Sequence, residues 1–60
     1  MTKTRDFDDW AAEVARELMT HGVPLLEAKH LPYDEEEWFR REFDAGESAG
    51  MTALEWVNNS

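Results

Sequence analysis

The sequence predicts an all-α protein, a compact three-to-four-helix miniature domain, and three observations support this prediction. Apolar residues recur with a helical period near the start of the chain. Trp10, Trp38 and Trp56 lie in three separate segments, so large rings can gather in one small core. The chain has 60 residues and no cysteine, so no disulfide supports that core. We expect a flexible N-terminal tail over residues 1–6 and a single helical domain over residues 7–58.

The clearest helix is predicted over residues 7–20. Asp6 is placed to cap its start, and Gly22 is suited to end it in the left-handed conformation. One stripe with a 3.6-residue period comprises Phe7, Trp10, Ala11, Val14, Ala15, Leu18 and Met19.

The next segment, residues 23–32, lies between two prolines. Pro24 suits the first turn of a helix, whereas Pro32 is expected to stop any longer one. A short helix and a loop held by leucines both fit this segment.

A second strong helix is expected to start at Asp34. Asp34 and Glu37 have nearly the spacing of a capping box, and the pairs Glu36–Arg40 and Glu37–Arg41 have the favourable i,i+4 spacing. Its apolar side consists of Trp38, Phe39 and Phe43.

The last helix has two possible starts. In one, Gly46 ends the preceding helix and Ser48 caps the next; in the other, Thr52 is the cap and Glu55 completes a capping box. Local chemistry favours Thr52. We therefore expect a core made of Phe7, Trp10, Val14, Leu18, Leu26, Trp38, Phe39, Phe43, Leu54 and Trp56.

Residues for catalysis and metal binding are scarce. The only serines are Ser48 and Ser60, neither in a nucleophile turn, so we expect no enzyme and no catalytic residue. His21 and His30 have no convergent partners in the sequence, so we expect no metal site and no cofactor. No stretch is apolar enough for a membrane span or a signal peptide, which favours a cytoplasmic protein.

The net charge of −8 is concentrated in the second half of the chain. Residues 34–47 hold seven acids and two bases, a composition that opposes direct binding to nucleic acid. Such a surface is suited to a basic groove on a partner protein, although a charged surface can also serve solubility alone. The candidate partner-binding residues are Asp34, Glu35, Glu42, Asp44 and Glu47, with an aromatic anchor among Tyr33, Trp38 and Phe39.

The stretch from Phe43 to Ala49 is similar to an aromatic-x-x-Gly-x-Ser-Pro tail of small phage proteins, with Ala49 in place of the proline. In size and charge the chain also resembles anti-CRISPR proteins, small phage-encoded inhibitors of CRISPR effectors. That resemblance implies a non-enzymatic inhibitor that imitates DNA.

We therefore expect a protein-binding inhibitor of phage or mobile-element origin. Its acidic surface would occupy a basic nucleic-acid-binding groove on a host protein such as a CRISPR effector subunit. A monomer is favoured over a homodimer. The alternative is a structural, assembly or antitoxin-like helical subunit that binds a partner chain through apolar surface.

Overall fold

The computed structural model describes residues 6–59 and confirms the all-α prediction. It contains four helices: α1 (Phe7–Thr20), α2 (Leu25–Asp34), α3 (Glu36–Asp44) and α4 (Ala49–Asn59). No strand occurs within the described residues. The predicted tail lies outside them, apart from Asp6.

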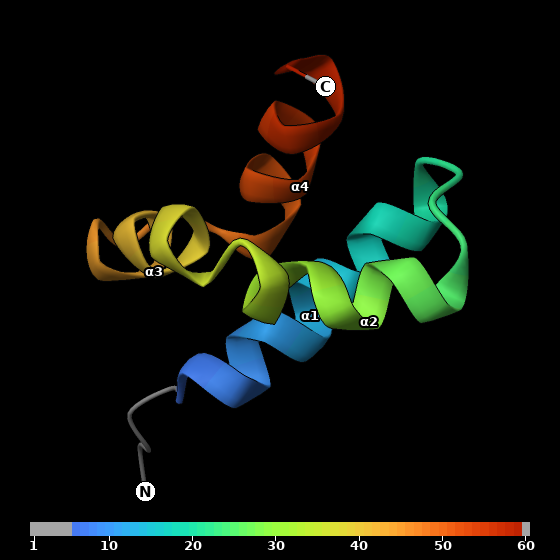
Figure 1. Ribbon diagram of the computed structural model, residues 1–60. Helices are drawn as coiled ribbons and strands as arrows, with labels where there is room; N and C mark the ends of the chain where they lie inside the picture. Colours follow the sequence, from blue (N-terminus) through green and yellow to red (C-terminus); the bar gives the residue numbers. More distant parts are fainter. Residues whose placement is uncertain (1–5, 60) are drawn as a thin grey trace, which may run out of the picture.

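Helix α1 is the centre of the arrangement. Both α2 and α4 pack along it, while α3 contacts α2 and, to a smaller extent, α1. The molecule is elongated, with extents of 34 × 18 × 18 Å. Figure 1 shows α3 at one end and the turn between α1 and α2 at the other. The two ends are therefore separate surfaces.

Helix α1 begins and ends as the sequence predicts. Asp6 is its N-cap residue, although the Asp6 side chain makes no capping hydrogen bond. Gly22 has a φ of 100°, a backbone conformation that residues with a Cβ rarely adopt. The N–H of Gly22 donates to the Met19 carbonyl, and the N–H of Val23 donates to the Leu18 carbonyl. These two bonds form a Schellman motif that ends the helix.

The prediction that Pro32 stops the second segment is wrong. Pro32 lies inside α2, which continues to Asp34. Proline lacks an N–H and disfavours a helical residue before it, but Leu31 and Pro32 are both buried in the core. Burial of these two side chains offsets the local preference.

Helix α3 starts two residues later than predicted. Asp34 is the last residue of α2, and Glu35 is at once the C-cap of α2 and the N-cap of α3. The backbone of Glu35 leaves the helical region, with φ of −111° and ψ of 44°. The two helices are thus joined at a single residue. The N-cap of α3 is Glu35, not Asp34.

Helix α4 begins after Ser48, so the preference for Thr52 as its cap is wrong. Gly46, with φ of 84°, ends α3 in a second left-handed turn. The Ser48 Oγ accepts a hydrogen bond from the Met51 N–H at 3.2 Å. Thr52 is buried within the helix, and its hydroxyl donates to the Ser48 carbonyl at 2.8 Å. The buried stripe of α4 is therefore Ala49, Thr52 and Ala53, continued by half-buried Trp56 and Val57.

Two of the expected core residues lie at the surface. Leu26 is 70% exposed because the buried stripe of α2 consists of Ala28, Leu31 and Pro32. Leu54 is 38% exposed because the start at Ala49 places it off the buried stripe of α4. Of the other expected core residues, Phe7, Trp10, Val14, Leu18 and Phe39 are buried, and Trp38, Phe43 and Trp56 pack against them half-buried.

Trp10 lies at the centre of the aromatic core. Its ring centroid is 5.7 Å from that of Phe7, 6.5 Å from that of Phe39 and 5.3 Å from that of Phe43. Its indole Nε1 donates to the Glu47 carbonyl oxygen at 3.0 Å. One side chain of α1 thus holds both α3 and the loop that leads to α4.

The cap at Ser48 can be tested by substitution. We expect Ser48→Ala to lower the free energy of unfolding by about 1 kcal/mol, because the Met51 N–H loses its acceptor. Ser48→Asn, which retains an acceptor, should stay close to the original protein. Urea unfolding measures both, and equal stability of the Ala and Asn variants would contradict this assignment.

The role of Trp10 leads to a second prediction. Trp10→Phe should lower the free energy of unfolding by about 1–3 kcal/mol, because it shrinks a fully buried ring and removes the bond to Glu47. Thermal unfolding followed by circular dichroism measures the loss. Trp56→Phe is the matched control at a half-buried ring and should cost less.

Candidate functional site

The five acidic residues predicted to bind a partner all lie on α3 or at its two ends. Asp34 and Glu35 form the junction with α2, Glu42 and Asp44 lie in α3, and Glu47 is in the loop before α4. All are exposed except Glu42, which is half-buried. We call these five residues the acidic end of the molecule; they gather around one short helix but do not share one face.

Glu42 is half-buried and lies close to Glu55 of α4. Its pKa is raised above the ordinary glutamate value, first because burial desolvates the carboxyl group and then because the negative charges of Glu55 and Glu47 lie nearby. A hydrogen bond from the protonated Glu42 carboxyl to Glu55 raises the pKa of Glu42 further, while the positive charge of Arg41 lowers it. The junction of α3 and α4 therefore holds three mutually repelling acids.

Glu55 is a member of this cluster that the sequence reasoning missed. With Thr52 as the cap, Glu55 is assigned to a capping box in the first turn of the last helix. The start at Ala49 moves it to the middle of α4, where it reaches α3. Ser48 as the N-cap was the alternative that the sequence also allowed. With that start, Glu55 lies outside the first turn of the helix and is available to contact α3.

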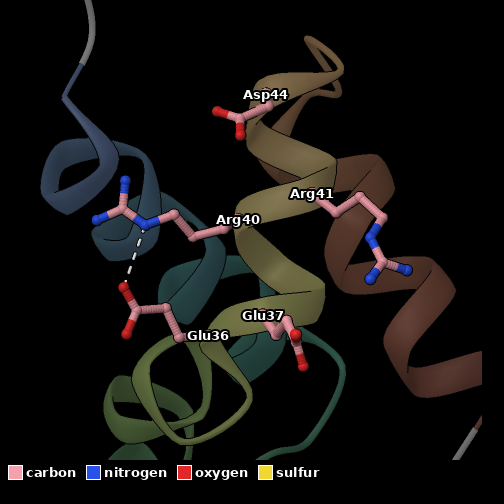
Figure 2. Close-up of a pocket in the computed structure, with 5 residues that line it drawn as sticks. All are labelled: Glu36, Glu37, Arg40, Arg41 and Asp44. Carbon is pink, nitrogen blue, oxygen red and sulfur yellow. Dashed lines mark hydrogen bonds and ion pairs between the residues drawn. The ribbon is translucent and has the colours of Figure 1, made fainter.

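The outer surface of α3 carries both signs of charge. An open depression of about 520 Å³ is lined by Glu36, Glu37, Arg40, Arg41 and Asp44. Figure 2 shows Arg40 and Arg41 leaving the helix on opposite sides. Asp44 is the one predicted partner-binding residue that lines this depression. Arg40 and Arg41 line it too, so the depression is not purely acidic.

Arg40 is held by two contacts. Its Nε donates to Glu36 Oε2 at 3.1 Å, which confirms the predicted Glu36–Arg40 pair, and its guanidinium carbon lies 4.3 Å from the centroid of the Phe7 ring. Both side chains of the ion pair are about half exposed, so the pair contributes roughly 0.2–1 kcal/mol. Glu37 and Arg41, the other pair expected from the sequence, line the same depression but form no ion pair in Figure 2.

The three candidate aromatic anchors have different surroundings. The Tyr33 hydroxyl donates to Asp8 Oδ1 at 2.8 Å, and this bond is the main cause that raises the pKa of Tyr33. Trp38 is half-buried against Phe39 and Trp56, with ring centroids 4.8 and 5.6 Å away. Phe39 is fully buried, so its candidacy as an exposed anchor is wrong.

The charge of the molecule is separated along its length. Residues 34–47, which include all of α3, hold seven acids and two bases. Residues 6–17 hold five further acids and one base, whereas residues 18–33 hold one acid, Glu27, and one base, Lys29. The turn between α1 and α2, residues 21–24, holds no acid, lysine or arginine and lies at the end opposite α3 in Figure 1, so the molecule has an acidic end and a nearly neutral one.

Residues 6–59 contain neither a cluster suited to a metal ion nor a helix suited to span a membrane. In that range, no three side chains among histidine, aspartate and glutamate converge to hold a metal ion. None of the four helices combines the length and apolar character that crossing a bilayer requires. What the acidic end offers chemically is a negative electrostatic field.

Comparisons with known proteins return no match. No family model, no curated protein and no solved structure is significantly similar to this chain.

The environment of Glu42 predicts a dependence of stability on pH. A carboxyl group whose pKa is raised in the folded state destabilises that state at neutral pH, and the penalty fades as the pH falls through that pKa. We therefore expect Glu42→Gln to raise the melting temperature at about pH 7 by roughly 2 °C, as for the loss of a like-charge pair. The gain should vanish below the ordinary glutamate pKa of 4.5.

The matched control for this test is Glu37→Gln. Glu37 lies in the first turn of the same helix, where a negative charge is favourable, so neutralising it should not raise the melting temperature. Melting curves for both variants across acidic and neutral pH decide the question. A gain for Glu42→Gln that stays constant with pH would contradict the assigned cause.

Proposed function

We propose that this protein is a non-enzymatic binding protein whose acidic end docks into a basic, nucleic-acid-binding groove of a partner protein. In this role Asp34, Glu35, Asp44 and Glu47 supply the negative field around α3 that attracts the partner's basic side chains. Glu42 adds to the same field from the junction with α4. The protein would thereby compete with nucleic acid for the groove.

The observation that supports this proposal best is the separation of charge. If the acids served solubility alone, an even distribution would serve equally well. Instead seven of the fourteen acids fall within residues 34–47, against two bases. Repulsion between acids that lie close together opposes folding. A chain of 60 residues has only a small free energy of unfolding to offset that repulsion.

Electrostatics gives such an end a kinetic advantage. A concentrated negative field steers the protein toward a positive groove and raises the association rate, more so at low salt. Grooves that bind DNA or RNA are strongly basic because they must neutralise phosphates. The resemblance in size and charge to anti-CRISPR proteins makes a CRISPR effector subunit the first partner to test.

The test is a competition experiment. Purified nucleic-acid-binding proteins, guide-loaded CRISPR effectors included, are mixed with a fluorescent DNA duplex, and displacement by this protein is followed. With a partner found in this way, we expect the double variant Asp44→Asn, Glu47→Gln to associate several-fold more slowly at low salt. The difference should shrink at about 300 mM salt, where the Debye length is shorter.

The matched control neutralises two acids elsewhere, Asp9 in α1 and Glu27 in α2. The double variant Asp9→Asn, Glu27→Gln has the same net charge as the test variant, so any difference between them reports position. Circular dichroism verifies that both fold. If both variants slow association equally, or if no protein of the set releases its DNA, the proposed function is wrong.

A further inference from the structure

The neutral end of the molecule exposes large apolar side chains. Leu25 and Leu26 at the start of α2 are 56% and 70% exposed, and Met19 near the end of α1 is 43% exposed. Tyr33, two turns further along α2, is 45% exposed. Soluble monomers seldom expose a cluster of this kind unless it binds something.

Tyr33 also lines a groove between α1 and α2, and Met19 and Leu25 each lie about one helical turn from another residue of its lining, Ala15 and Lys29 respectively. The groove has a volume of about 190 Å³ and is lined by Asp8, Ala11, Ala12, Ala15, Lys29 and Tyr33, so it holds one acid and one base. Alanine side chains are short, so another chain can come close to the backbone of α1 there. On α2, Leu25, Lys29 and Tyr33 follow one another at a spacing of four residues and therefore share a side of the helix. We call Ala12, Met19, Leu25, Leu26, Lys29 and Tyr33 the α1–α2 face.

The charge around this face suits a second copy of the same chain. Two molecules of net charge −8 repel each other, most strongly through their acidic ends. Residues 18–33 carry no net charge, and the turn between α1 and α2, next to Met19, Leu25 and Leu26 in the chain, lies at the opposite end of the molecule from α3 (Figure 1). Because the Debye length is about 8 Å in physiological salt, the acids of α3 are largely screened at this end of the face, whereas Asp8 and Glu36 act on Tyr33 at its other end.

Dimerisation would also add stability to a small fold that has little of its own. A core of this size supplies little stability, and small domains commonly gain more through a disulfide, a metal or an oligomer. This chain has no cysteine, and residues 6–59 place no metal-binding group. Association of two apolar faces would remove Leu25 and Leu26 from water in both copies.

We propose that the α1–α2 face pairs with the same face of a second copy and forms a weak homodimer. A two-fold arrangement brings the neutral ends together and leaves the two acidic ends far apart and exposed. The face contains few large side chains, so the interface is small and the dissociation constant lies in the micromolar range or above. The proposal is independent of the proposed function, and it differs from the monomer favoured by the sequence analysis.

Sedimentation equilibrium on the full chain tests this proposal, at concentrations from about 10 μM to about 1 mM. We expect the average mass of the unmodified protein to rise from that of one chain toward that of two. Leu26→Glu should remain a monomer throughout, since it places a charge at the most exposed apolar side chain of the face. The substitution lies in the first turn of α2, where glutamate is favourable, so the fold should persist.

The matched control is Met51→Glu. Met51 is 53% exposed on α4, away from the α1–α2 face, and it too accepts glutamate in a first helical turn. We expect Met51→Glu to dimerise like the original protein, and so should the Asp44→Asn, Glu47→Gln variant. A protein that stays monomeric at every concentration would overturn the proposal. Dimerisation that Leu26→Glu leaves intact, or that Met51→Glu abolishes as well, would also overturn it.

Discussion

The contact on which most of this structure depends is the burial of Trp10 with its indole N–H bonded to the Glu47 carbonyl. A tryptophan buries much apolar area, but its N–H must find an acceptor when it leaves water. Here the acceptor is a backbone group 37 residues away, in the loop after α3. The bond therefore fixes where that loop lies, and through it the direction in which α4 begins.

The same constraint arranges the charged surface. With Trp10, Phe39 and Phe43 packed together, one side of α3 is committed to the core and its acids must lie elsewhere on the helix. Asp44 reaches the outer surface, whereas Glu42 turns toward α4 and meets Glu55. The acidic end is thus a consequence of aromatic packing as much as of composition.

The sequence predicted the fold class well and several element boundaries less well. The stripe of α1 is long and has strong end signals at both termini, so its range was predicted correctly. Pro32 and Thr52 were misjudged because local preferences of about 1–3 kcal/mol compete with the burial of whole side chains. Leu26 and Leu54 were misplaced for a related reason: hydrophobicity shows that a residue favours burial, but only the helix start shows which residues share the buried side.

By itself, the sequence determined the helical class, the first helix, the aromatic composition of the core and the concentration of acids after position 33, because these are properties of local pattern and composition. Only the tertiary structure decided that Ser48 starts α4, that Glu55 joins Glu42 and Glu47, and that Leu25 and Leu26 stay in solvent. Each of these depends on which helix faces which. That choice is made by packing between residues far apart in the chain, and no local preference encodes it.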